Sequence, residues 1–237
     1  MDLNKYRYLI FSSHKSSTQS LKSIFLKNGY NSIHCHQLFQ LEYIFKNTKI
    51  SNEIFIDSLK KYKDTGVKIK IVSIIRNPID RLPSSFFQSY HNDEIDFLKK
   101  KVNETTVNSK NSEQLFDFFQ ERIKKNDLRG KDESIDELSN IFNINLIDRL
   151  EKKDGYYYFN HDLFEIFVLN FKEVIGSNNL EYLNKVLKID LNIKTRQNLS
   201  NNKSYYNKYI ILKQRIPTEL NNLIKTQYNN FYFNAFQ

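Results

Sequence analysis

The sequence contains little cysteine, proline or glycine and no tryptophan: one Cys, three Pro and five Gly occur in 237 residues. A single cysteine, Cys35, excludes an internal disulfide and a cysteine-based zinc cluster. The sequence also lacks any run of 18 apolar residues that would span a membrane as a helix. Its amino terminus enters a predicted strand without a signal-peptide pattern. We therefore expect no membrane span and a cytoplasmic location.

The scarcity of proline and glycine also removes the usual markers of a linker, and the sequence shows no internal repeat. A length of 237 residues suits one domain over residues 1–237. Such a domain buries about 70–75% of the surface that its unfolded chain exposes. The net charge of +9 favours an anionic partner: a nucleotide, an acidic glycan, nucleic acid or a membrane surface. Solvated, lysine-rich faces would explain the same charge without a partner.

The most informative segment reads I-I-R-N-P-I-D-R-L-P-S-S-F-F, at Ile74–Phe87. A hydrophobic strand is predicted over Val67–Ile75 and runs directly into Arg76. Asn77 and Pro78 end this strand, because proline lacks the N–H that a strand ladder needs. Arg76 is therefore predicted at the carboxyl end of a buried strand, which is where open α/β sheets bind ligands.

A helix is expected to begin near Arg81, where Asp80 can cap it. Ser84 would then lie about two turns into this helix, eight residues after Arg76. A guanidinium and a hydroxyl that converge at a strand end can clamp a phosphate.

A second pattern suited to anions lies near the amino terminus. The sequence predicts a strand over Tyr6–Phe11, a polar loop over Ser12–Ser17 and a helix from Thr18 to Lys27 that Gly29 ends. This arrangement directs backbone N–H groups and the positive end of a helix at an anion. The two glycines of a Walker loop are missing, which weakens the interpretation as a mononucleotide kinase.

Both patterns resemble motifs of one family. K-S-S-T-Q-S at Lys15–Ser20 resembles the 5′-phosphosulfate loop of sulfotransferases that use PAPS (3′-phosphoadenosine 5′-phosphosulfate). R-N-P-I-D-R-L-P-S at Arg76–Ser84 is similar to the 3′-phosphate motif of the same family. The likeness is greatest to carbohydrate sulfotransferases of the glycosaminoglycan and bacterial capsular-polysaccharide types. It implies an α/β fold, specifically a P-loop-like three-layer sandwich with a central, mainly parallel sheet flanked by helices.

The resemblance also implies which residues hold PAPS, the donor substrate, without a metal. Lys15 would neutralise the leaving 5′-phosphate and the transferring group. Arg76 and Ser84 would hold the 3′-phosphate, with Ser84 preferred over Ser85 by the family spacing. Ser17 stands where many family members have glycine; if that position requires a positive φ, serine costs about 1 kcal/mol. The loop's backbone N–H groups and hydroxyls would come from Ser16, Ser17, Thr18, Gln19 and Ser20.

The second predicted strand, Ser32–His36, ends in a histidine pair that can supply a base. Its period of two places His34 and His36 on one face, with Cα atoms about 6–7 Å apart, and turns Cys35 toward the core. Histidine is the commonest general base, and this H-x-H resembles the histidines proposed to deprotonate the sugar in the glycosaminoglycan branch. We expect His36 to activate the acceptor hydroxyl, with His34 as orienter or second base. Two core histidines and a metal-binding pair are the alternatives.

Strands and helices alternate over the first ninety residues, which predicts a parallel sheet covered by helices. The polar middle of the chain, residues 92–145, is expected to be mostly helical. The remaining predicted elements are strands at Tyr156–Phe159 and Phe164–Asn170, followed by helices at Leu180–Leu187, Tyr205–Gln214 and Thr218–Tyr228.

The sequence therefore predicts a PAPS-dependent sulfotransferase that acts on a hydroxyl of a saccharide or related cell-envelope acceptor, with no nucleic acid as partner. A nucleotide-dependent kinase is the first alternative, but it would need a magnesium carboxylate where Arg76 and Asn77 follow the third strand. A basic nucleic-acid-binding protein that uses the positive charge and the tyrosines is the second. A sulfotransferase fold that only binds is the third. The acceptor stays open.

Overall fold

The structure, a computed structural model, describes residues 1–13, 16–46, 49–96, 112–125, 134–194, 206–216 and 218–236. The chain divides into two compact units. The first consists of Met1–Arg76, Asp132–Gln197 and Phe236, and the second mainly of Asn77–Lys131 and Asn198–Ala235. Each unit is described by itself, and the single domain expected over residues 1–237 stays a prediction.

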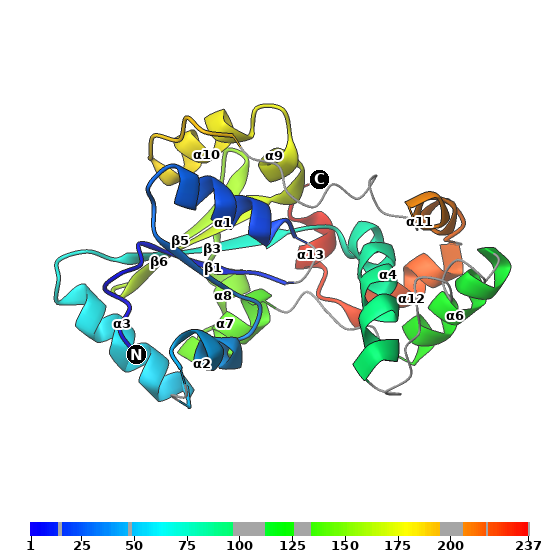
Figure 1. Cartoon of the computed structure of the whole chain (residues 1–237), viewed down its shortest axis with the longest axis horizontal. Coiled ribbons are helices and arrows are strands. Elements are labelled where there is room, and N and C mark those ends of the chain that lie inside the picture. Colours follow the sequence, from blue (N-terminus) through cyan, green and yellow to red (C-terminus); the bar gives the residue numbers. More distant parts are fainter. Residues whose placement is uncertain are drawn as a thin grey trace. The chain divides into compact units, whose positions relative to one another are not determined.

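One six-stranded sheet forms the centre of the first unit, in the order β2-β1-β3-β6-β5-β4 (Figure 1). Strands β2, β1, β3 and β6 run parallel, whereas β5 is antiparallel to β6 and β4 is antiparallel to β5. The expected α/β class with a mainly parallel central sheet is thereby confirmed. The strands are β1 (Tyr8–Phe11), β2 (Ser32–Cys35), β3 (Ile69–Ile75), β4 (Glu151–Lys153), β5 (Tyr156–Asn160) and β6 (Phe164–Asn170).

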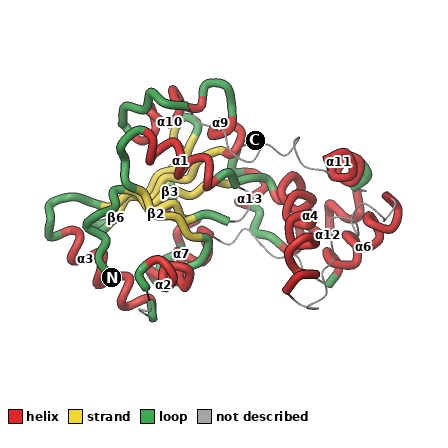
Figure 2. Tube along the Cα trace, viewed as in Figure 1, coloured by secondary structure: helices red, strands yellow, loops and turns green. Residues whose placement is uncertain are grey.

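Helices cover both faces of this sheet, as Figures 1 and 2 show. On one face lie α1 (Thr18–Lys27), α9 (Phe171–Ile175) and α10 (Asn179–Leu187). On the other lie α2 (Leu41–Ile44), α3 (Asn52–Lys63), α7 (Ser134–Phe142) and α8 (Leu146–Arg149), with the short 3-10 helix η1 (Leu38–Gln40) before α2. Coverage on both faces explains why β1 and β3 read as nearly continuous hydrophobic runs: all four β1 residues are buried, and six of the seven in β3.

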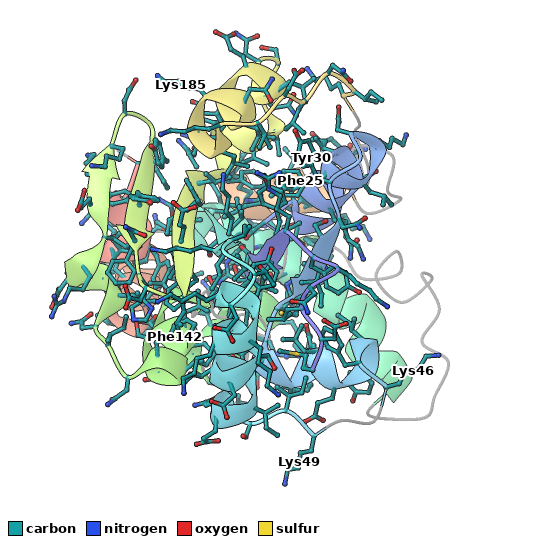
Figure 3. The ribbon with its side chains drawn as sticks, turned by 90° about the vertical axis from the view of Figure 1, so that its left-hand side faces the viewer. Phe25, Tyr30, Lys46, Lys49, Phe142 and Lys185 are labelled. Atoms are coloured by element: carbon teal, nitrogen blue, oxygen red, sulfur yellow. The ribbon has the colours of Figure 1, made fainter. Side chains whose placement is uncertain are left out.

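Helix α1 shows how the sequence pattern becomes packing. Its apolar residues Leu21, Ile24 and Phe25 recur at helical spacing, and all three are fully buried against Tyr8 and Ile10 of β1. Phe25 packs directly on the ring of Tyr8, with centroids 4.5 Å apart. On the opposite face Phe142 of α7 stacks on Phe164 of β6 at 4.1 Å, and Figure 3 shows Phe25 and Phe142 on opposite sides of the sheet.

The second unit is helical within its described residues. Its core joins Leu82 and Phe86 of α4 to Phe119 of α6, Leu212 of α11 and Ile224 of α12, together with neighbouring apolar residues. The helices are α4 (Pro78–Asp96), α6 (Ser112–Lys124), α11 (Tyr206–Gln214), α12 (Thr218–Gln227) and α13 (Phe231–Asn234).

The helix after β3 begins earlier than its sequence suggests. Asn77, not Asp80, initiates it: Asn77 Oδ1 accepts from the N–H of Ile79 (3.0 Å), and Pro78 takes the first helical position. The Asp80 carboxylate instead forms an ion pair with Lys213 of α11, with Nζ 2.6 Å from Oδ1. The prediction of a start near Arg81 was therefore wrong by one turn.

Within the described ranges, no helix is both long and apolar enough to cross a membrane.

Candidate functional site

The order in which the strands are connected across the sheet reverses at β1. The chain passes from β1 to β2 on one side and then returns to β3 on the other side of β1. In open α/β sheets this is the switch point, and ligands bind there, outside the carboxyl ends of the strands. The residues that follow β1 and β3 are Ser12 and Arg76, so both predicted anion motifs begin at the switch point.

Ser12 joins the two strands that flank the switch point. Its Oγ donates to the carbonyl oxygen of Ile74 (2.8 Å) and accepts from the N–H of Ile74 (3.0 Å), although the residues are 62 positions apart in sequence. Ser12 is fully buried. This serine therefore fixes the start of the β1–α1 loop against β3, two residues before Arg76.

The loop is braced from within. Ser13 and Ser16 are buried, and their hydroxyl oxygens lie 3.2 Å apart in a hydrogen bond. The Ser16 hydroxyl, expected to contact the phosphosulfate, thus forms a hydrogen bond inside the loop. Of the two Ser16 groups predicted to bind the phosphosulfate, only the backbone N–H is left for that role. Lys15, predicted to neutralise the leaving phosphate, and its neighbour His14 lie outside the described residues.

Ser17 carries backbone strain at the start of α1. It adopts the left-handed conformation (φ 59°, ψ 25°), and its side chain makes no capping hydrogen bond in the part of the chain that the structure describes. The position therefore does require a positive φ, as the glycine of the sulfotransferase motif suggested. Thr18 begins the helix and is buried, and Ser20 follows within the first turn. A first helical turn has N–H groups without intrahelical acceptors, which is the usual anion-binding element.

Gln19 connects the loop to the histidine pair. Its side-chain nitrogen lies 3.4 Å from Nδ1 of His34, which is paired with Ile10 in the adjacent parallel strand β1. The rings of His34 and His36 are perpendicular, with centroids 4.5 Å apart. The predicted common face for the two histidines is confirmed, and Cys35 between them is buried as expected.

Two hydrogen bonds hold His36, and a third holds the turn that follows it. Its Nδ1 lies 2.6 Å from the carbonyl oxygen of Ser12, and its backbone N–H donates to Oε1 of Gln40 (2.7 Å). Two residues on, the N–H of Leu38 donates to Oε1 of Glu137 on α7 (2.8 Å). Burial lowers the pKa of His36 below its usual 6.5, and the hydrogen bond to Ser12 acts in the opposite direction. The lowered pKa favours the neutral imidazole of His36.

Arg76 lies over an aromatic ring at the end of β3. Its guanidinium carbon is 4.5 Å from the centroid of Phe171, the first residue of α9. Stacking uses the face of the guanidinium, whereas a phosphate binds its edge, so the two contacts are compatible. Ser84, its predicted partner, lies on α4 in the second unit and is half-buried, while the adjacent Ser85 is buried. The approach of Arg76 to Ser84 stays a prediction.

Arg81 is a buried cation of helix α4. It is fully buried in the second unit, with its guanidinium carbon 5.8 Å from the ring centroid of Tyr228 and Nη2 3.5 Å from that hydroxyl. Tyr228 follows α12, so this contact attaches the end of α12 to α4.

Sequence reasoning missed four residues that support this edge of the sheet. Ser12 and Gln40 bind backbone groups, Glu137 comes from a distant helix, and Phe171 reads as an ordinary core aromatic. Only Ser12 had a signal, as the first polar residue after a buried strand. Glu137 belonged to an acidic segment that reads as a solvated helix face.

Among the described residues, no group of three or more His, Cys, Asp or Glu side chains could hold a metal ion. Comparisons with protein-family models, with curated proteins and with solved structures find no match for this chain. The likeness to sulfotransferases therefore rests on the two motifs themselves.

Proposed function

We propose that this protein is a PAPS-dependent sulfotransferase that moves a sulfuryl group to a hydroxyl of a saccharide or related cell-envelope acceptor, on a P-loop-like sandwich. One observation carries the proposal: Ser12 connects all three parts of the candidate site. Its carbonyl accepts from His36 of the edge-strand turn, its Oγ binds β3 just before Arg76, and its backbone begins the β1–α1 loop. A donor loop, a base and an arginine at one sheet edge are the parts that the reaction needs.

Sulfuryl transfer, like phosphoryl transfer, depends mainly on positioning and on charge stabilisation. The first turn of α1 would bind the 5′-phosphosulfate through backbone N–H groups, with Lys15 adding positive charge. Arg76 would bind the 3′-phosphate, together with Ser84. His36 would take the proton of the acceptor hydroxyl as the acceptor oxygen bonds to sulfur. The bond from sulfur to the 5′-phosphate oxygen then breaks and releases 3′,5′-ADP.

The 3′-phosphate provides the first test, because it distinguishes PAPS from simpler adenylates. Calorimetric titration should show tighter binding of 3′,5′-ADP than of 5′-AMP, by about 10- to 100-fold for a charge-assisted phosphate contact. The Arg76→Ala variant should lose this preference. Arg149→Ala, which removes the same charge from an exposed position on α8, should keep it. Equal affinity for both nucleotides in the unaltered protein contradicts the assignment.

Transfer itself is tested with radiolabelled PAPS and a lysate fraction of glycans and lipids as acceptors. Label should move to the glycans, and His36→Ala should abolish transfer while 3′,5′-ADP still binds. ATP turnover with magnesium would favour the kinase instead. Salt-dependent retention of oligonucleotides that 3′,5′-ADP does not affect would favour a nucleic-acid-binding protein.

A further inference from the structure

The segment that follows β2 carries an exposed aromatic face. It runs from the 3-10 helix η1 directly into α2, over Leu38–Ile44. On its outer side Phe39 is 49% exposed and Tyr43 is 79% exposed, and the neighbouring Ile44 is exposed as well. Every other Phe or Tyr side chain that the structure describes is buried or half-buried. The two rings therefore distinguish this segment from the rest of the described chain.

This segment is fixed to the end of β2. Oε1 of Gln40 accepts from the N–H of His36 (2.7 Å), and the N–H of Leu38 donates to Oε1 of Glu137 on α7 (2.8 Å). On the inner side of the segment, Leu38 and Leu41 are buried. The outer rings are thus exposed on a segment that packing and hydrogen bonds hold in place, and a ligand would meet them already ordered.

The two rings lie on one face and close to the candidate site. The backbone from η1 through α2 is helical, so residues four apart share a face and lie about 6 Å apart along the axis. Phe39 follows His36 by three residues, which span about 10 Å at most. A short chain-like ligand can therefore contact the rings of Phe39 and Tyr43 and also extend to the carboxyl end of β2.

The chemistry of this face suits a saccharide. The flat face of an aromatic ring packs on the C–H face of a pyranose, while the sugar hydroxyls and the Tyr43 hydroxyl keep their water. The proposed transfer also needs a hydroxyl at the end of β2, which a sugar supplies at its rim. Lys46 and Lys49 are exposed at the end of the segment (Figure 3), and their charge complements acid groups of a glycan. An uncharged apolar partner would gain nothing from these two lysines.

We propose that Phe39 and Tyr43 form a stacking subsite for the acceptor, and that the acceptor is a saccharide chain of at least two hexose residues rather than a small alcohol. This inference rests on the proposed function and names its acceptor class. One hexose lies on the rings while a neighbouring hexose offers its hydroxyl at the end of β2. The rings touch a part of the acceptor that does not react, so they should lower KM without changing kcat.

Saccharide binding is tested first without any donor. Calorimetric titration uses cellotetraose, maltotetraose and hyaluronan tetrasaccharide as probes at millimolar concentration. The unaltered protein should bind at least one of them. Phe39→Ala and Tyr43→Ala should each weaken that binding by about 2- to 10-fold, and Tyr43→Phe, which keeps the ring, should not. Binding of none of the three probes overturns the proposal.

Val67→Ala is the matched control. Val67 is 48% exposed, almost as Phe39 is, but it precedes β3 and so lies at the amino edge of the sheet. This variant should keep the affinity of the unaltered protein for the saccharide. An equal loss of affinity in Val67→Ala and Phe39→Ala overturns the subsite.

A lipid surface is the competing occupant, because aromatic and lysine side chains also suit a membrane interface. Sedimentation with vesicles of phosphatidylcholine and phosphatidylglycerol tests it. Vesicle binding that requires Phe39 and Tyr43, without binding of any saccharide probe, overturns the proposal.

Transfer from radiolabelled PAPS separates the subsite from the proposed function. With the tetrasaccharide that binds as acceptor, Phe39→Ala should raise KM by about 2- to 10-fold, with kcat and the affinity for 3′,5′-ADP unchanged. An unchanged KM, or an equal KM for the corresponding monosaccharide, overturns the subsite. Saccharide binding that requires the rings, in a protein that does not bind 3′,5′-ADP, supports the subsite and refutes the sulfotransferase assignment.

Discussion

The left-handed backbone of Ser17 gives a prediction whose sign depends on local geometry. At φ 59° a non-glycine residue costs about 1–2 kcal/mol, because Cβ approaches the carbonyl oxygen. Glycine removes this cost but loses about 0.5–1 kcal/mol to the greater freedom of the unfolded chain. Ser17→Gly should therefore stabilise the first unit by about 0–1 kcal/mol. Ser17→Val should destabilise it, since a β-branched residue at positive φ is a genuine outlier.

Ser23 provides the matched comparison, because it lies in the interior of the same helix, α1. There Ser23→Gly should cost about 0.5 kcal/mol through helix propensity. Urea unfolding of both variants, followed by circular dichroism, should place the midpoint of Ser17→Gly above that of Ser23→Gly. The expected difference is about 1 kcal/mol, which corresponds to about 2–4 °C in a thermal scan of a chain of this size. Equal loss in the two variants would refute the strain assigned to Ser17.

Three further predictions concern the same sheet edge. Ser12→Ala leaves the buried N–H and carbonyl of Ile74 without their side-chain partner, so urea unfolding should show a loss of about 2–4 kcal/mol; a loss below 1 kcal/mol would contradict the bridge. The pKa of His36 is lowered in the folded state, so its stabilising contribution is complete above pH 6.5 and is lost as the pH falls through the folded pKa. Between pH 8 and pH 5 the urea midpoint should fall further in the unaltered protein than in His36→Gln. Parallel curves of midpoint against pH for the two proteins would argue against a lowered pKa of His36. Phe171→Leu removes the ring under Arg76 and should reduce the preference for 3′,5′-ADP over 5′-AMP by about 3- to 10-fold, as calorimetry measures, while Phe171→Tyr keeps it.

Local sequence patterns predicted with good accuracy several of the helices and strands that position the site. Helix α1 and strand β6 have the bounds that their periodicity and end signals indicate. The histidine face of β2 follows from the two-residue period of any strand. These features depend on neighbours in sequence, and for that reason a sequence shows them.

Other features depend on partners that are far away in the chain. Nothing near Glu137 indicates that its carboxylate accepts from Leu38, and nothing near Arg81 indicates its burial beside Tyr228. The early start of α4 is a local exception: Pro78 was interpreted only as the end of a strand, although proline also suits the first position of a helix.

The distant contacts of Ser12 and Gln19 change what the two sequence motifs mean. Taken separately, a serine-rich loop and an H-x-H pair are two weak signals on two strands. In the structure the loop's first carbonyl accepts from one histidine, and an amide from the loop's helix faces the other. A ligand that displaces the loop must therefore alter the hydrogen bonds of both imidazoles. The serine-rich loop and the H-x-H pair, read as separate signals in the sequence, are therefore in direct contact at the carboxyl ends of β1 and β2.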